Sequence, residues 1–572
     1  MPPRRRGHGA APRAALPTGA EDIRVFLARQ SRGARYDSSV SKDLAWWQRG
    51  IIYQIYPRSF YDSNGDGIGD LRGITAKLDY LRWLGADGLW ISPFYPSPNA
   101  DFGYDVADYC DVDPMFGDLR DFDELIREAH ARDLRVILDY IPNHTSDRHP
   151  WFIESRAGRG SPKRDWYIWR DPAPGGGPPN NWQSAFGGSA WELDPVSGQY
   201  YLHIFLPEQP DLNWRNPEVE AAMIDVIRFW LGRGVDGFRM DAVQNVIKDE
   251  LLRDNPINPD YRAGTDPFDK YLRVYSGDRP EVHHLIAKLR RVLDEEPGRV
   301  LIGEVYNTVE KVMTYYGEGC QGCHFPYNFQ LIMLPWEARI IERAIARYEE
   351  LLPPEAWPNW VLGNHDRHRV ATRAGKAQAR VAAMLLLTLR GTPTLYYGEE
   401  IGMEDVPIPP ELEQDPWGLR VPGMGLGRDP ERTPMQWDSS PAAGFSSSSK
   451  KEPWLPVAAD YREVNVERLR EDPASILSLY RRLIDLRRSE PALHGGSQRL
   501  LPTEGSAIAY VREGSGARFG VALNLGSEAR AVDLPGIRGQ VVLSTHLDRE
   551  GERASDKVEL RGDEGVVLRI EG

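Results

Sequence analysis

The chain has 572 residues, 41% hydrophobic and 27% charged, so it is long enough for a large core and one or two smaller domains. Its 84 acidic and 70 basic residues give a formal charge of −14, which argues against nucleic acid or an anionic membrane as the main partner. A small neutral or cationic ligand fits this balance better. The 17 Trp and 25 Tyr residues suit sugar rings, although ordinary core packing accounts for most of them.

The first twenty residues contain arginines with no continuous apolar segment behind them, so they lack the pattern of a secretory signal. Their Pro, Gly and Ala content predicts a disordered arm over residues 1–45. No run of 18 apolar residues occurs in the sequence, which predicts a protein that does not span a membrane. The three cysteines, Cys110, Cys320 and Cys323, form no disulfide framework and favour a cytoplasmic location.

Short apolar runs alternate with segments of helical period along most of the chain. This alternation predicts βαβ units and a parallel sheet. Helical spacing is clearest over residues 119–133, 218–234 and 375–391. The expected strands begin at Ile51, Gly85, Leu134, Gly234, Arg299, Cys323, Asn359 and Pro393. Eight such units predict an α/β fold of the (β/α)8 TIM-barrel type.

The longest insertion follows the third expected strand and covers residues 144–207. It is rich in Trp, Pro and Gly without a clear period, so we expect a loop-rich subdomain above the top face of the barrel. The barrel itself is assigned to residues 46–143 and 208–490. Short alternating strands near the end of the chain predict a C-terminal β-sandwich over residues 491–572.

Three expected strands end in a carboxylate, namely Asp241 in GFRMDAV, Glu304 in LIGEVYN and Asp366 in GNHDRHR. Polar residues at the C-terminal ends of barrel strands face the mouth, where loops meet the substrate. One such acid could simply pair with an arginine in the core. Three at equivalent positions, with His144 and His365 beside them, indicate a catalytic site. Paired carboxylates, one protonated and one ionised, are what glycoside hydrolysis requires.

The neighbours of two of these acids suggest different roles. Arg239 lies two residues before Asp241 and faces the same side of the strand, so its charge predicts an ionised Asp241, as a nucleophile needs. Glu304 has no adjacent arginine and is flanked by Gly303 and Val305. Less polar surroundings predict a raised pKa for Glu304, as a general acid needs.

Four separated signatures, DYIPNH, GFRMDA, GEVY and GNHD, resemble those of the α-amylase superfamily of glycoside hydrolases, from about Trp46 to the end of the chain. Any one would be a weak signal, but four in this order are specific. The resemblance implies that Asp241 is the nucleophile and Glu304 the general acid and base, while Asp366 grips the glucose being cleaved. It also implies retention through a covalent glucosyl-enzyme, with the two catalytic acids about 5–5.5 Å apart.

Finer features resemble the oligo-1,6-glucosidase and α-glucosidase branch, including EQPDLNW with Gln209 and DFGYDVADY with Asp101 and Tyr104. In such relatives Asp101 holds the non-reducing hydroxyls and Tyr104 stacks on the sugar. A pocket closed at its floor implies exo action on one terminal glucose. The residues that the resemblance assigns to substrate binding are Asp101, Tyr104, His144, Phe186, Gln209, Arg239, His365 and an arginine in GRDPERTPMQW, either Arg428 or Arg432.

The linkage prediction depends on Ala242, directly after the nucleophile. In relatives of this branch a valine there accompanies α-1,6 preference, whereas alanine or threonine accompanies α-1,4 preference. The resemblance therefore implies an α-glucosidase acting on maltose and short malto-oligosaccharides. An oligo-1,6-glucosidase stays an alternative, because one methyl-sized change is worth only about 1–3 kcal/mol of discrimination.

Two further alternatives remain open. A transglucosylase or isomerase acting on sucrose, maltose or trehalose would share the covalent intermediate and differ in whether water or a sugar intercepts it. A catalytically silent, sugar-binding or transporter-associated relative would have lost a catalytic acid or gained a membrane anchor. All three acids are present here and no anchor is visible, which disfavours the silent relative.

The segment DSNGDGIGD places oxygen-bearing side chains at alternate positions with glycines between them. This pattern resembles a calcium loop of EF-hand type, without the downstream helix and bidentate Glu of a true EF-hand. We expect this loop to bind a structural Ca²⁺ or Mg²⁺. The alternative is a loop without a cation, folded as a turn of Asx type. The expected ligands are Asp62, Asn64, Asp66, the backbone carbonyl of Ile68, and Asp70.

Overall fold

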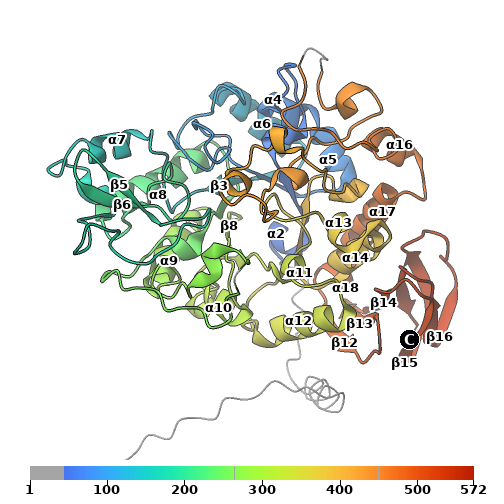
Figure 1. Cartoon of the computed structure of the whole chain (residues 1–572). Coiled ribbons are helices and arrows are strands. Elements are labelled where there is room, and N and C mark those ends of the chain that lie inside the picture. The colour runs from blue at the N-terminus through green and yellow to red at the C-terminus, as the bar shows by residue number, and fades with distance from the viewer. Residues whose placement is uncertain (1–43, 263, 448–450, 572) are drawn as a thin grey trace, which may run out of the picture.

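A computed structural model describes residues 44–262, 264–447 and 451–571. The predicted disordered arm, residues 1–45, lies outside the described residues except for its last two. The structure forms a barrel of eight parallel strands surrounded by helices (Figure 1). The strands are β1 (Ile52–Ile55), β2 (Gly88–Ile91), β3 (Arg135–Tyr140), β7 (Gly237–Met240), β8 (Val300–Gly303), β9 (Phe325–Pro326), β10 (Asn359–Val361) and β11 (Thr392–Tyr396). All eight predicted strands are confirmed.

The hydrogen-bonded order runs from β10 through β11, β1, β2, β3, β7 and β8 to β9. All positions of β1, β2, β7 and β8 are buried, which explains their nearly continuous apolar letters, since helices cover the outside of a parallel barrel. Among the described strands, β9 and β10 are not paired with each other. Across that seam the Asn359 side-chain oxygen accepts the Asn328 N–H at 3.4 Å.

The outer helices include the three predicted from helical spacing. Asp118 caps α6 by accepting backbone N–H groups of its first turn, and Asn216 caps α8, where a proline follows at the first helical position. The principal helices are α4 (Leu71–Ala76), α5 (Leu78–Leu84), α6 (Leu119–Ala131), α8 (Pro217–Gly232), α9 (Glu281–Leu293), α10 (Val309–Thr314), α12 (Ala338–Leu351), α13 (Val370–Ala374), α14 (Lys376–Thr388), α16 (Val466–Glu471) and α17 (Ile476–Ser489). In the part of the chain described here, no helix is both long and apolar enough to cross a membrane.

The segment between β3 and α8 contains more regular structure than its irregular sequence suggests. Helix α7 (Pro150–Arg156) is followed by a three-stranded antiparallel sheet with the order β4-β6-β5. The strands are β4 (Trp169–Arg170), β5 (Trp191–Asp194) and β6 (Gln199–Leu202). Trp182 and Trp191 pack in a small core of this segment, which extends beside α8 in Figure 1.

The C-terminal strands form one antiparallel sheet with the order β12-β13-β14-β17-β15-β16. They are β12 (Ser497–Leu501), β13 (Ala507–Gly514), β14 (Ala517–Asn524), β15 (Arg530–Ser544), β16 (Arg553–Leu560) and β17 (Gly565–Ile570). β15 also contacts β13 and β14, which are not its hydrogen-bonded neighbours, so the sheet folds over its own core of Val, Leu and Ile residues. The C-terminal β-domain predicted as a β-sandwich is thus confirmed as an antiparallel β-structure, built from one folded six-stranded sheet.

Candidate active site

A cavity of about 610 Å³ lies where the loops after the barrel strands meet. Asp241 follows β7 directly, Glu304 follows β8 directly, and Asp366 lies five residues after β10. Nine predicted site residues line it: Asp101, Tyr104, His144, Phe186, Asp241, Glu304, His365, Asp366 and Arg428. The other three predicted residues, Gln209, Arg239 and Arg432, are buried and contact members of this lining. The structure therefore brings all twelve together.

Arg239 lies beneath the cavity and joins three carboxylates. It donates to Asp241 Oδ1 at 2.8 Å and forms an ion pair with Glu304 Oε1 at 2.6 Å. The same guanidinium group also binds Asp139, which comes from β3. Its side chain is 1% exposed, so all three ion pairs are shielded from water. Because a planar guanidinium has five donors in a rigid fork, one arginine can hold three acids at fixed positions.

These contacts correct one prediction made from neighbours in the sequence and add a second influence to another. Glu304 does have an arginine beside it, because β7 and β8 are adjacent strands and bring Arg239 next to it. The expected effect of Arg239 on Asp241 is present, because its charge lowers the pKa of that carboxyl. Burial has the larger effect and raises this pKa well above its ordinary value, and the charges of Glu304 and Asp139 raise it further.

The prediction of a raised pKa for Glu304 is confirmed, and burial is its main cause. Arg239 and the Ala242 N–H both oppose that rise. Asp241 and Glu304 lie close enough to influence each other. Two coupled buried carboxyls lose their protons in separate steps, so over an interval of pH the pair holds a single proton.

Ala242 connects the two acids through the backbone. Its φ of 41° and ψ of 35° are left-handed, which turns the chain sharply after Asp241. In this conformation its N–H donates to Glu304 Oε2 at 2.7 Å. The residue chosen for the linkage prediction therefore also positions the predicted general acid.

His365 is packed between two tyrosine rings. The Tyr104 ring is parallel to the imidazole, with ring centroids 5.4 Å apart. The Tyr56 ring is also stacked on it, with centroids 5.8 Å apart. The Gln54 amide nitrogen lies 2.7 Å from Nδ1 and the Tyr104 hydroxyl 2.7 Å from Nε2. Burial lowers the pKa of His365 well below its ordinary value, so the ring is neutral. Because the Gln54 amide N–H donates to Nδ1, the ring hydrogen lies on Nε2 and donates a hydrogen bond to the Tyr104 hydroxyl.

A network of arginines lies along one side of the cavity. Arg428 contacts Asp101 at 2.7 Å, Asp366 at 3.2 Å and Asp415 at 2.6 Å. Arg432 donates to the same Asp366 oxygen at 3.0 Å. Burial favours the neutral form of Asp366, but the positive charges of Arg428 and Arg432 oppose it, and the pKa of Asp366 is lowered. Both arginines proposed for this position therefore contribute to the site.

Asp415 is a member of this network that sequence reasoning missed. It is fully buried and anchors Arg428 through the guanidinium group and the backbone N–H. Asp415 directly precedes a short helix, α15 (Pro416–Arg420). The surrounding sequence has no clear periodicity, so nothing in it marked this acid as buried.

A second buried network positions His144. Gln209 reaches both His144 Nε2 at 3.0 Å and Asp101 Oδ2 at 3.1 Å. Behind them, Lys248 forms an ion pair with Asp211 at 2.6 Å and donates to Asn143 at 2.6 Å. Lys248 was not anticipated, because it belongs to the irregular segment after β7. Burial lowers the pKa of His144 to about 3, so this ring is also neutral.

The outer part of the cavity is lined by aromatic and charged side chains. Phe186 contacts Phe205 and Trp417, with ring centroids 6.0 and 5.9 Å away. The segment between η3 (Val243–Asn245) and α9 contributes further lining that the sequence reasoning did not predict, including Phe268 and Arg273. The sequence did contain a signal for this second insertion, because the segment between the fourth and fifth strands is long and rich in Pro and Asp.

The predicted cation loop has a compact structure built on Asp62. Its carboxylate is fully buried and accepts N–H groups from Asn64 at 3.1 Å, Gly65 at 2.6 Å and Gly67 at 2.8 Å. Asp70 caps α4 through the Gly73 N–H at 2.6 Å. These hydrogen bonds are the ones expected for an Asx turn, which was the alternative to a cation site. They also fix the side-chain oxygens of alternate residues on the same loop, as a cation site would need. Asn64 is exposed and Asp66 half-buried, so both can accept a further partner.

Comparisons with known proteins agree with the fold and the site. The profile of the alpha amylase catalytic domain matches residues 54–496. A probable alpha-glucosidase of Rhizobium meliloti (strain 1021) is 43% identical over 536 residues, covering 90% of this chain and 96% of the relative. An oligo-1,6-glucosidase of Heyndrickxia coagulans is 38% identical over 545 residues, covering 88% of this chain and 96% of the relative.

Among solved structures, an alpha-glucosyl transfer enzyme superposes with a TM-score of 0.88 at 42% identity, covering 92% of this chain and 100% of that chain. Fold and site together define a (β/α)8 glycoside hydrolase. The chain belongs to the alpha-amylase family, in agreement with the resemblance seen in its four signatures.

Proposed function

We propose that the protein is an exo-acting, retaining α-glucosidase that releases terminal α-1,4-linked glucose from maltose and short malto-oligosaccharides. The observation that carries the proposal is the Arg428 network, which joins Asp101 and Asp366 at one side of the cavity containing Asp241 and Glu304. Such a wall binds the terminal sugar and blocks passage of a longer chain beyond it.

In the proposed reaction, an Asp241 oxygen attacks the anomeric carbon while Glu304 gives its proton to the departing glycosidic oxygen. Glu304 then removes a proton from water, which attacks the same carbon and breaks the bond to Asp241. Two inversions at one carbon return the α configuration. The single proton held by this pair must lie on Glu304 for the first step.

Three contacts prepare this arrangement. Arg239 holds both acids, so ionised Asp241 keeps a charged partner when it attacks. The Ala242 N–H binds Glu304 Oε2 and leaves the other oxygen to Arg239, which fixes the carboxyl plane. Asp366, with its lowered pKa, stays ionised and can accept hydroxyl hydrogen bonds from the bound glucose.

The test is a kcat/KM panel over maltose, isomaltose, sucrose, trehalose and maltotriose, with the anomer of the released glucose followed by NMR. We expect maltose to exceed isomaltose and the first product to be α-glucose. Faster cleavage of isomaltose would overturn the linkage, and β-glucose as first product would overturn retention. Wild-type glucose release by an Asp241→Asn variant would overturn the mechanism itself.

Transfer of glucose to another sugar is a second candidate activity, supported by the similarity to the alpha-glucosyl transfer enzyme. The same intermediate would be intercepted by a sugar hydroxyl instead of water. Chromatography of products from concentrated maltose separates the two outcomes, since hydrolysis yields only glucose and transfer yields new oligosaccharides.

We also propose that the loop of residues 62–70 binds Ca²⁺ and that the enzyme acts in the cytoplasm. Alternating oxygens on a loop with two positive-φ glycines, Gly65 and Gly67, support the first proposal. The three cysteines are free, which supports the second.

A further inference from the structure

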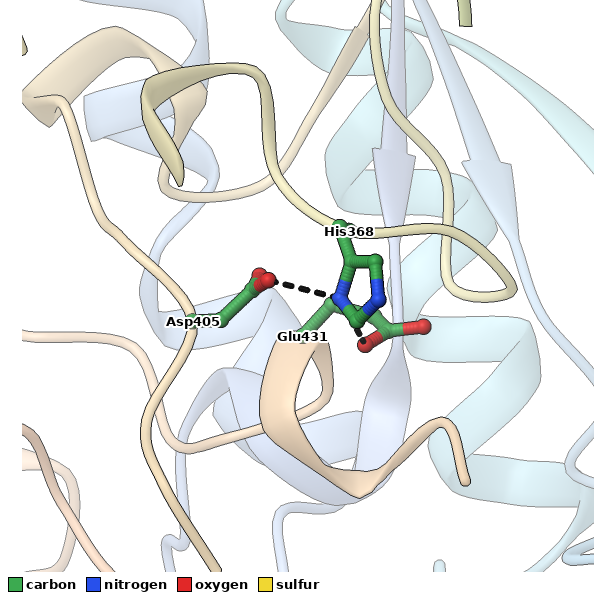
Figure 2. A group of neighbouring side chains, drawn as sticks. All are labelled: His368, Asp405 and Glu431. Carbon is green, nitrogen blue, oxygen red and sulfur yellow. Dashed lines mark ion pairs between the residues drawn. The ribbon is translucent and has the colours of Figure 1, made fainter. Parts of the chain in front are cut away.

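Three side chains outside the cavity converge from separate loops (Figure 2). His368 lies two residues after Asp366, Asp405 follows η6 (Glu399–Ile401), and Glu431 ends η8 (Asp429–Glu431). One potential ligand atom from each lies within 4.8 Å of the others, and the described residues offer no second group of this kind.

The distances suit a small cation. His368 Nδ1 lies 2.8 Å from Asp405 Oδ2 and 3.8 Å from Glu431 Oε2, and both carboxylates face the same imidazole nitrogen. Ligands bonded to one cation at about 2.0–2.2 Å lie roughly 3–3.5 Å apart. The observed separations bracket that spacing, so side-chain shifts of less than about 1 Å would complete the geometry.

Glu431 gives an independent indication of a missing partner. Its side chain is 2% exposed, and within the described ranges its Oε2 atom has no hydrogen-bond donor. A buried carboxylate oxygen without a donor is costly, and a surface ion pair between His368 and Asp405 would not require it. The unpartnered oxygen points at the imidazole nitrogen, where a cation would satisfy it.

The surroundings fix the other ligands and leave an entrance. Asp405 Oδ1 accepts the Arg369 N–H at 2.8 Å, which orients the carboxylate and frees Oδ2. The His368 side chain is 52% exposed, so a cation can enter from solvent and keep water in its remaining positions.

We propose that His368, Asp405 and Glu431 bind a divalent transition-metal cation of the Zn²⁺ type. One imidazole nitrogen and two carboxylates suit Zn²⁺, Mn²⁺, Co²⁺ or Ni²⁺ better than Ca²⁺ or Mg²⁺, which prefer oxygen ligands throughout. None of the three residues lines the catalytic cavity. The site is therefore structural and not part of the hydrolytic reaction.

The cation would join two loops that hold Asp366. His368 belongs to the loop that carries Asp366, and Glu431 precedes Arg432, which donates to Asp366 Oδ1 at 3.0 Å. A bond from the cation to each loop would restrain the Asp366–Arg432 contact. Binding should consequently raise the melting temperature of the protein.

The test is calorimetric titration of Zn²⁺ into the chelator-treated full chain in saturating Ca²⁺, which keeps the loop of residues 62–70 filled. We expect one Zn²⁺ per chain, with affinity reduced more than about tenfold in His368→Gln and in Asp405→Asn. His284→Gln, at an exposed histidine, is the matched control and should bind as the wild type does.

Zn²⁺ should raise the melting temperature of the wild type and of His284→Gln, and should raise it less in His368→Gln and Asp405→Asn. Co²⁺ should give a visible absorption band in the wild type that is absent in His368→Gln. Absence of Zn²⁺ binding by the wild type overturns the proposal. Equal binding by His368→Gln and the wild type also overturns it, because the cation would then be held by other groups. Neither readout depends on the proposed glucosidase activity.

Discussion

The backbone N–H of Ala242 donates to Glu304 Oε2 at 2.7 Å, from a residue with a φ of 41°. The position of Glu304, the proposed general acid, therefore depends on a left-handed turn that a β-branched side chain adopts only with strain. The proposed linkage preference and the position of Glu304 therefore depend on the same residue.

Replacing Ala242 tests that link. We expect Ala242→Val to lower kcat/KM for maltose about tenfold and to raise the isomaltose-to-maltose ratio, because strain displaces the N–H and the larger side chain narrows the adjoining space. Ala242→Gly keeps the N–H and tolerates positive φ, so it should stay within a few-fold of the wild type. Equal losses in both variants would show that the turn does not matter.

Arg239 should be required by its geometry as well as by its charge. In Arg239→Lys a single ammonium group replaces a fork that contacts three acids, so at least one buried carboxylate loses its partner. We expect a fall in the free energy of unfolding of about 3–5 kcal/mol and loss of measurable turnover. Thermal melting and kcat give the two readouts. Wild-type kcat in this variant would contradict the role assigned to the fork.

Asp415 is expected to affect substrate binding more than chemistry. Asp415→Asn weakens the anchor of Arg428, which in turn holds Asp101 and Asp366. KM for maltose should rise about tenfold or more, with a smaller change in kcat, measured by steady-state kinetics. Glu411→Gln, an exposed acid in the same stretch, is the control. A change in kcat alone would place Asp415 in the chemical step instead.

Glu399 should make stability decrease as pH rises. Burial raises the pKa of this carboxyl to about 8 in the folded protein, against an ordinary value of 4.5, and the Tyr480 hydroxyl donates to it at 3.1 Å. Between these pH values the folded state holds a proton that the unfolded state has lost, so the free energy of unfolding falls with rising pH. Below pH 4.5 both the folded and the unfolded state hold this proton, so Glu399 no longer makes the free energy of unfolding depend on pH.

Glu399→Gln should therefore flatten the dependence of stability on pH. Between pH 5 and 8 we expect the wild type to lose a few kcal/mol more than the variant, by denaturant titration at each pH. Glu355→Gln, at an exposed acid, should follow the wild type. Identical pH slopes in wild type and Glu399→Gln would rule the effect out.

Chelation tests the proposed Ca²⁺ loop. Removing the cation should lower the melting temperature by several degrees, because the carboxylates of the loop would then face one another without a counter-charge. Added Ca²⁺ should restore it in the wild type but not in Asp66→Asn. If elemental analysis finds no metal and chelator has no effect, the loop is an Asx turn held by its own hydrogen bonds.

The eight strands could be predicted because parallel strands that are buried on both faces consist almost entirely of apolar residues. The three acids could be predicted because each follows such an apolar run. The Arg239–Asp241 pair could be predicted from its spacing on one strand, but partners that come from other strands and loops could not. Arg239 reaches Glu304 across 65 positions because β7 and β8 are neighbours, and no local pattern contains that pairing. Asp415 lies in an irregular stretch, where neither helical nor alternating periodicity marks a buried residue.

The seam between β9 and β10 gives the barrel a preferred place to open. The Asn359 side chain bridges it, accepting from Asn328 on one side and donating to the Thr392 carbonyl at 2.8 Å on the other. Elsewhere each strand is joined to its neighbour by a ladder of backbone bonds. Amide exchange should therefore be fastest along this joint, and because Asn328 also lines the cavity, heat would open the catalytic chamber before the rest of the ring comes apart.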